Sequence, residues 1–297
     1  VTIDLVARVT RAKSWPLDDA AAPLGGAMIL SAEDDPADTM VPRLIAADAD
    51  LSRVKLLDCV RETSATGNPF ERGFSLERDL QLLERELALA PDCRLIVVDP
   101  ISAYLGSTDT HRNADVRALL TPFIKLAQRH DVAIVAISHL NKGTGLHANY
   151  RVTGSIAFTA TARAVYLIAK DPDDPKRRLM MPIKNNLAQD ETGLAYRINV
   201  TRDGIAFVEW DSRSVSVAPD EVLNPDPDSS AKDEAMTFLR DILANGAQPA
   251  KAVLAAAREA GIAERTLHRA KKALGVVSGK HQFEAEWLWT MRPKRSD

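Results

Sequence analysis

Acidic side chains follow two short apolar runs of this sequence. Residues 27–30 lead into Glu33 and its acidic neighbours, and residues 95–98 lead into Asp99. A carboxylate at the end of a buried strand can hold Mg²⁺ beside a nucleotide phosphate, usually through water. A second carboxylate nearby can polarise the water that attacks that phosphate. We therefore predict phosphoryl-transfer chemistry, with Asp99 facing the metal and Glu33 acting on the water.

A third apolar run, residues 132–137, ends in Ser138-His139. A polar residue at that place can sense the terminal phosphate and pass its state to the following loop. These features also have structural interpretations. An Asp-Pro pair favours a turn, Asp34 or Asp35 can cap the next helix, and a lone His is more often structural. Three successive strand ends that carry Glu, Asp and Ser-His nevertheless favour a shared site.

The elements that would position these residues alternate between helices and strands. Helices are expected over residues 1–12, 38–47, 74–89 and 113–130. Strands are expected over residues 27–30, 54–57, 94–99 and 132–138. Such alternation predicts an α/β fold with a mostly parallel sheet, whose carboxyl strand ends form one ligand-binding edge. Further strands, predicted to extend this sheet as hairpins, span residues 164–168, 178–183, 195–200 and 205–210.

Composition and charge divide the chain into two parts. Of its 297 residues, 45% are hydrophobic and 27% are charged, which is typical of a globular protein. Residues 211–231 are rich in Ser, Pro and Asp and are interpreted as a linker between domains at 1–210 and 232–297. The last 68 residues hold 12 Lys/Arg and 8 Asp/Glu, whereas the whole chain carries a net charge of −3. A basic tail on an acidic body favours a polyanionic partner for the tail, or simply a slightly basic surface.

The expected cellular context is the cytoplasm. The two cysteines lie in apolar stretches without metal-like spacing, which favours a reducing compartment. No apolar run approaches the length of a membrane span, so no membrane partner is expected.

The tail has the pattern of a helix-turn-helix domain. Helices are expected over residues 231–246, 251–260 and 264–272, followed by a hairpin near residues 282–289. Arg265, Arg269 and Lys272 recur at helical spacing and would form a basic, DNA-contacting face. A protein-contacting module is the alternative.

Taken together and in order, these motifs resemble the RecA-like ATPases of the hexameric helicase type, the DnaB and plasmid RepA group. The similarity is greater to AAA-family ATPases of the RepA-like kind, and it covers about residues 1–210. It is carried by Ile29–Asp35, Leu95–Ser102, Ser138–Gly143, Gly154-Ser155 with Arg163, and Lys184–Asn186. The resemblance implies a RecA-like P-loop NTPase core with C-terminal hairpins and, in the tail, a small winged-helix domain.

The resemblance also implies roles for individual residues. Glu33 would activate water, Asp99 would support Mg²⁺, and His139 would occupy the sensor position, where relatives often have Gln. Lys184 would reach the nucleotide of the neighbouring subunit.

Further assignments concern the nucleotide and DNA. Ser138 and Arg163 are expected to contribute to nucleotide binding. The loop that contains Lys142 and Arg151 would face single-stranded DNA in a central channel.

Two features depart from the family pattern. The sequence contains no Gly-x-x-x-x-Gly-Lys-Ser/Thr, the loop that cradles phosphates, although its opening residues match the helix that follows that loop in the family. We expect the loop ahead of Val1, and the alternative is a degenerate ATPase that has lost it. The family's Lys-x-Arg is Lys184-Asn185-Asn186 here, so Lys184 would act alone, or Arg178 or Arg163 would serve as the arginine finger.

These observations predict an ATP-dependent, DNA-associated motor or loader of the RepA-type replicative helicase class. It would use ATP and Mg²⁺ and assemble as a hexameric ring on single-stranded and, through its tail, duplex DNA. Two alternatives remain open. One is a non-enzymatic DNA-binding regulator on a degenerate ATPase scaffold, and the other is a RecA-like recombination mediator.

Overall fold

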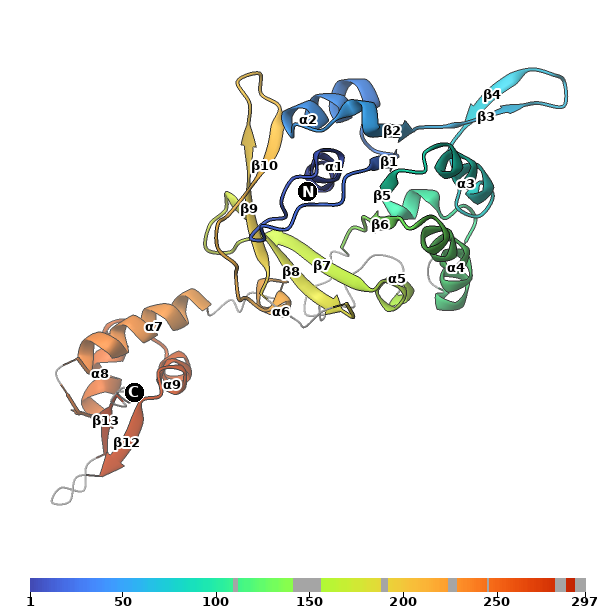
Figure 1. Ribbon diagram of the computed structural model, residues 1–297. Coiled ribbons are helices and arrows are strands. Elements are labelled where there is room, and N and C mark those ends of the chain that lie inside the picture. The colour runs from blue at the N-terminus through green and yellow to red at the C-terminus, as the bar shows by residue number, and fades with distance from the viewer. Residues whose placement is uncertain are drawn as a thin grey trace. The chain divides into compact units, whose positions relative to one another are not determined.

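The computed structural model describes residues 1–108, 112–140, 156–187, 192–223, 229–244, 246–280 and 287–291 (Figure 1). The chain forms two compact units, Val1–Asn224 and Pro225–Asp297. The boundary between them falls inside the stretch predicted as a linker. Each unit has a hydrophobic core of its own.

The first unit is built on a four-stranded parallel sheet. Its strands are β1 (Gly26–Ser31), β2 (Val54–Leu57), β5 (Cys93–Asp99) and β6 (Ala133–Ala136), in the order β2-β1-β5-β6. All three pairings are parallel, so the carboxyl ends of the strands lie at one edge. The predicted α/β fold with a parallel sheet is confirmed.

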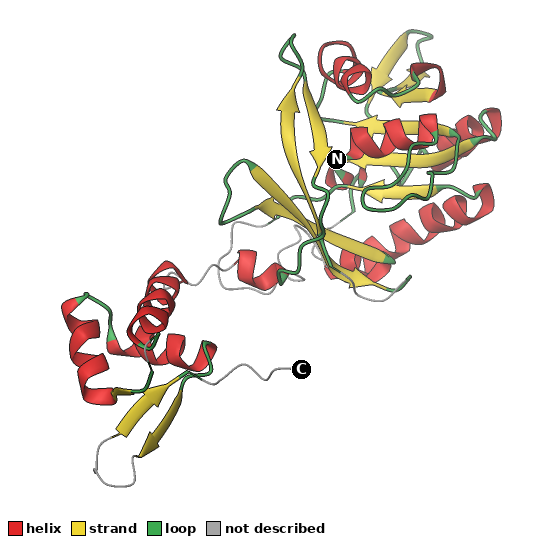
Figure 2. Ribbon diagram, turned by 60° about the vertical axis from the view of Figure 1, so that its left-hand side comes forward, coloured by secondary structure: helices red, strands yellow, loops and turns green. Residues whose placement is uncertain are grey.

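Helices cover both faces of this sheet (Figures 1 and 2). Alternate residues of a strand point to opposite faces, so Ile29 packs with α1 (Thr2–Arg11) and α2 (Val41–Ala46), whereas Met28 packs on the other side. That other side is covered by α3 (Leu80–Leu89) and α4 (Asn113–His130). The two central strands, β1 and β5, are buried on both faces, which explains their nearly unbroken apolar runs, whereas the outer strands β2 and β6 are only partly buried.

Short segments connect these elements. They comprise three one-turn helices, an outlying hairpin and one short α-helix: η1 (Pro36–Met40), η2 (Leu51–Arg53), η3 (Ile101–Tyr104), β3 (Val60–Thr63) with β4 (Pro69–Arg72), and α5 (Ile156–Thr161). The β3–β4 hairpin and α5 have no counterpart in the elements predicted from sequence.

The helix predicted over residues 74–89 is shorter in the structure and begins at Leu80. A turn replaces its first part because the buried Asp79 carboxylate accepts a hydrogen bond from the Ser75 backbone N–H, at 2.8 Å. Arg72 also donates to both oxygens of Asp79, at 2.6 and 2.7 Å. The helix therefore starts after Asp79, which occupies the N-cap position.

The later strands form a second, antiparallel sheet. They are β7 (Ala164–Lys170), β8 (Arg177–Asn185), β9 (Leu194–Val200) and β10 (Ala206–Trp210), in the order β10-β9-β8-β7. The four strands were expected to extend the parallel sheet as hairpins. Within the described residues they instead pair only with one another. One face of the sheet they form packs around a separate small hydrophobic core. The Trp210 Nε1–H donates to the Asp4 carboxylate at 2.8 Å. This bond joins the antiparallel sheet to α1, which covers one face of the parallel sheet.

The second unit contains three helices and a small antiparallel sheet. The elements are α7 (Ser229–Ile242), β11 (Gln248–Pro249), α8 (Ala250–Glu259), α9 (Glu264–Ala273), β12 (Val277–Lys280) and β13 (Trp287–Thr290). The strand order is β11-β13-β12. The first unit ends with α6 (Pro219–Leu223). Across the described part of both units, no helix combines the length and apolar character needed to cross a membrane.

Candidate active site

The three strand ends predicted to carry chemistry are joined by backbone hydrogen bonds. Ser31 is the parallel partner of Asp99, and the Ala32 N–H donates to the Asp99 carbonyl at 3.0 Å. On the other side, the Ile137 N–H donates to the Val98 carbonyl at 2.9 Å. These bonds fix where the chain leaves each strand and therefore where the following side chains begin.

Glu33 and His139 meet across this edge. The His139 Nε2 lies 3.2 Å from the Glu33 Oε1, and their side chains are 61% and 57% exposed. Ser138, between β6 and His139, makes a contact at the limit of hydrogen-bonding distance, 3.5 Å from its Oγ to the His139 carbonyl. The structure thus brings together two of the predicted residues, and it leaves both accessible to a ligand.

Asp99 lies at the end of the strand between them. Its side chain is partly buried, and this burial raises the pKa of the carboxyl group. The neighbouring carboxylates of Glu33 and Asp34 raise the pKa of Asp99 further. Carboxylate oxygens are the ligands that Mg²⁺ prefers, but within the described residues no three acidic, His or Cys side chains are grouped closely enough to hold a metal ion by themselves, so a cation here would rest on Asp99 with water and a ligand.

The other two acids of the first motif have separate partners. Asp35 caps η1, since its Oδ1 accepts hydrogen bonds from the Ala37 and Asp38 N–H groups, both at 2.8 Å. Asp34 pairs with Arg43 of α2 at 2.9 Å. The prediction that one of these two acids caps the next helix is confirmed for Asp35, and Glu33 is not used in that cap.

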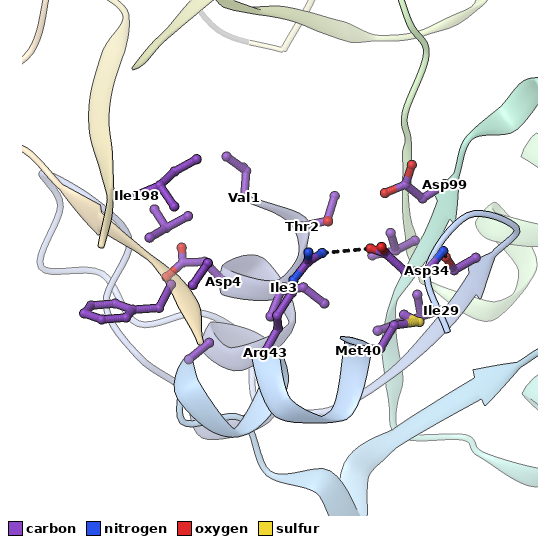
Figure 3. A pocket seen from close by; sticks show the side chains of 16 residues that line it. Val1, Thr2, Ile3, Asp4, Ile29, Asp34, Met40, Arg43, Asp99 and Ile198 are labelled. Carbon is purple, nitrogen blue, oxygen red and sulfur yellow. Dashed lines mark hydrogen bonds and ion pairs between the residues drawn. The ribbon is translucent and has the colours of Figure 1, made fainter. Parts of the chain in front are cut away.

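A pocket of about 300 Å³ opens beside these residues (Figure 3). Its lining includes the first turn of α1, Asp34, Asp99 and Arg43, together with the β9–β10 hairpin. Sequence reasoning missed Arg43. Arg43 is the one basic residue of α2, the helix that follows the acidic motif after η1. That position in the sequence was the available signal that its side chain lies on the same side of the sheet as the acids.

Two residues that were predicted to act on the nucleotide, Lys184 and Arg163, do not line this pocket. The Lys184 ammonium donates to the carbonyls of Thr159, Ala160 and Ala162, at 3.0, 3.0 and 2.7 Å, and so caps the end of α5. The Arg163 side chain is exposed, and its carbonyl accepts from the Asn186 N–H at 2.9 Å.

The remaining candidate finger, Arg178, also has local contacts. Its guanidinium donates to the carbonyls of Pro175 and of its own neighbour Arg177, at 2.8 and 3.0 Å. The two channel-loop residues, Lys142 and Arg151, lie outside the described residues.

The basic helix of the second unit is α9. Lys272 is exposed on it and Arg269 is half-buried, while the side chain of Arg265 lies outside the described part. Their neighbour Lys271 lies 4.1 Å from the centroid of the Trp289 ring and also donates to the Ser278 hydroxyl, so it ties α9 to the hairpin. Burial lowers the pKa of Lys271.

Comparisons with known proteins add one match in sequence. Residues 1–145 match the family model described as an AAA domain, which is slightly less than half of the 297 residues. No curated protein matches the sequence. This match supports an ATPase of the RecA-like P-loop class.

A solved structure described as that of the RadB recombinase is also similar. It is 14% identical, with a TM-score of 0.39, and the similarity covers 61% of this chain and 77% of the other. This likeness is too distant to bear on function.

Proposed function

We propose that this chain hydrolyses ATP as the core of a DNA-associated motor or loader of the RepA-type helicase class. One observation carries the proposal. Glu33 and His139 touch across the strand that ends in Asp99, at the carboxyl edge of a parallel sheet. All three residues lie within the stretch that matches an AAA domain. That edge is where ligands bind in open α/β sheets.

The arrangement assigns a task to each side chain. Glu33 would accept the proton of the attacking water, and its exposed carboxylate leaves room for that water. His139 would donate a hydrogen bond to the terminal phosphate. Asp99 would hold the hydrated Mg²⁺, which when bound neutralises charge on the phosphates. Arg43 adds a positive charge to the pocket that Asp99 lines.

The phosphates need a cradle of backbone N–H groups, which we place ahead of α1. The pocket opens at the first turn of this helix, where a phosphate-binding loop would deliver its N–H groups. The same turn lies close enough to Asp99 for both to line one pocket. If the complete protein has no such loop, the alternative of a DNA-binding regulator on a degenerate ATPase scaffold is favoured instead.

The second unit is proposed as a winged helix that contacts duplex DNA. Its order of one helix, a short strand, two helices and an antiparallel hairpin supports this proposal, because a winged helix combines a helix-turn-helix with such a hairpin. The second helix of the pair, α9, carries the basic residues, and Lys271 fixes the hairpin against it. A basic helix held in one orientation suits contact with phosphates.

A homo-hexameric ring is part of the same proposal, by resemblance to this helicase class. A role for Lys184 at a neighbouring subunit's nucleotide would require its ammonium to leave the three carbonyls of α5. Electron micrographs of the full-length protein with ATP and single-stranded DNA test the assembly. Rings are expected, whereas filaments would favour a recombination mediator.

The function itself is tested by steady-state ATP hydrolysis with the full-length protein. Mg²⁺-dependent hydrolysis that single-stranded DNA stimulates is the expected result. Duplex binding without any hydrolysis would support the regulator.

A further inference from the structure

The β12–β13 hairpin of the second unit is held against α9 through one of its two faces. Ser278 and Trp289 are direct partners across the two strands, so their side chains leave the same face. Lys271 of α9 donates to the Ser278 hydroxyl and lies 4.1 Å from the centroid of the Trp289 ring. The His268 ring meets the same indole edge to face, with 5.6 Å between the ring centroids. This face of the hairpin is therefore the one that α9 covers (Figure 1).

Two tryptophans share that face but differ in burial. Trp287 precedes Trp289 by two residues on β13, so both side chains leave the hairpin on the same side. Trp289 is 3% exposed and belongs to the core of the unit, whereas Trp287 remains 52% exposed. This exposure is unusual, because Trp is on average a highly buried residue. α9 thus covers the inner indole and leaves about half of the outer one in water.

The charge around Trp287 indicates the kind of partner that its indole would meet. The helix on this side of the hairpin ends in Lys271 and Lys272, and Lys272 is exposed. The last 68 residues hold 12 Lys/Arg and 8 Asp/Glu, a net charge of +4. An exposed aromatic ring beside cationic side chains is the combination that binds single-stranded nucleic acids, where cations contact the backbone and rings stack on bases.

The geometry of DNA decides which form would use both features. Inside a duplex each base is stacked between its neighbours and offers only its edges in the grooves. An indole could reach a base face there only by unstacking a step, which costs binding energy. An unpaired base next to the end of a duplex offers its face without that cost. A ligand that also offers duplex phosphates to α9 is therefore a junction between duplex and single strand.

Resting on the proposed contact of α9 with duplex DNA, we infer that the exposed indole of Trp287 stacks on an unpaired base, so that the second unit prefers a duplex with a single-stranded extension to a blunt duplex. Removal of one such stacking contact lowers affinity by about five- to fiftyfold. The preference concerns DNA structure rather than sequence, because every base has a flat face that an indole can cover.

Fluorescence-anisotropy titrations of residues 225–297, which have their own core, test the inference. The two labelled probes are a blunt duplex and the same duplex with a short unpaired thymidine extension. The extended duplex is expected to bind about five- to fiftyfold more tightly. Equal affinity for the two probes would overturn the inference and leave the contact of α9 with duplex DNA intact. Failure to bind either probe would overturn both.

Variants of the hairpin separate stacking from the additional phosphates of the extension. Trp287→Leu keeps an apolar side chain but removes the flat ring, so it should abolish the preference and leave the affinity for blunt duplex unchanged. Trp287→Phe should retain part of the preference, because it keeps a ring. Val277→Ala is the matched control, since Val277 is 37% exposed on the opposite face of the same hairpin. An undiminished preference in Trp287→Leu would contradict the inference.

Tryptophan fluorescence provides a second measurement that needs no variant. Trp287 and Trp289 are the two tryptophans of residues 225–297. Stacking on a base quenches indole emission, so the extended duplex should quench the emission of the parent unit and the blunt duplex should not. In Trp287→Leu the remaining indole is enclosed, and the extended duplex should leave its emission unchanged. Equal quenching of the parent unit by both probes would overturn the inference.

Discussion

The imidazole of His139 lies 3.2 Å from the carboxylate of Glu33, Nε2 to Oε1, although 106 residues separate them in the sequence. They follow β6 and β1, which are not neighbours in the sheet, because β5 with Asp99 lies between them. The contact therefore spans the strand that carries the proposed Mg²⁺ ligand. A terminal phosphate at this edge would compete with Glu33 for the imidazole N–H, which would free the carboxylate to act on water.

Replacement of Glu33 tests its role as the base. In the full-length protein, Glu33→Gln should retain nucleotide binding and reduce kcat by roughly 10²–10⁴-fold, because the amide keeps the shape but cannot accept a proton. Asp35→Asn is a suitable control, since Asn also caps helices and Asp35 is used in the η1 cap. Hydrolysis by Glu33→Gln at the parent rate would mean that another group activates the water.

Asp99→Asn is expected to stabilise the fold while it weakens nucleotide binding with Mg²⁺. Burial and neighbouring carboxylates raise the pKa of Asp99, so its ionised form costs stability at neutral pH. Without nucleotide, the variant should have a slightly higher Tm than the parent. The difference should shrink as the pH falls through the raised pKa, because the folded parent then takes up a proton at Asp99 and no longer carries the buried charge. An equal or lower Tm at neutral pH would show that Asp99 is not destabilising.

Lys184 should contribute to stability through the end of α5. Lys184→Met leaves three carbonyls without their charged donor, so the free energy of unfolding should fall by about 1–2 kcal/mol in denaturant titrations. Lys170→Met, at an exposed position of β7, should change it little. If Lys184→Met is as stable as the parent and loses only ATP hydrolysis in the assembled protein, the residue acts at a neighbouring nucleotide instead.

The second unit should bind duplex DNA through α9, with a strong dependence on salt. Each phosphate contact releases counterions and contributes roughly −0.9 to the slope of log K against log salt. With residues 225–297, which have their own core, Arg265, Arg269 and Lys272 changed to Ala together should flatten this slope by about two to three units. Arg240→Ala on α7 is the control, because Arg240 is exposed and outside α9. If the triple variant binds duplex as the parent does, the unit is a protein-contact module.

Much of the fold was predictable because periodicity and burial agree. The helix predicted over residues 113–130 has those same bounds in the structure, and the strands that end in Ser31 and Asp99 were recognisable from their apolar runs. Sequence proximity could not show the turn before α3, since it depends on Arg72 and Ser75 converging on Asp79. It also could not separate the second sheet from the first, because strand patterns do not specify partners.

The candidate site was predictable where it follows strand ends. Parallel strands bring their carboxyl ends together whatever connects them, so Glu33, Asp99 and His139 were expected near one another. Arg43 and Ile198 were not foreseen, because they reach the pocket from a helix and from a hairpin of the second sheet. Their positions depend on tertiary packing that no local pattern reports.

The most direct test is the rate of ATP hydrolysis by the full-length protein, measured with Mg²⁺ in the presence and absence of single-stranded DNA. The account predicts hydrolysis that requires Mg²⁺ and rises when single-stranded DNA is added. No hydrolysis under either condition, from a folded protein that carries an intact phosphate-binding loop ahead of Val1, would contradict it.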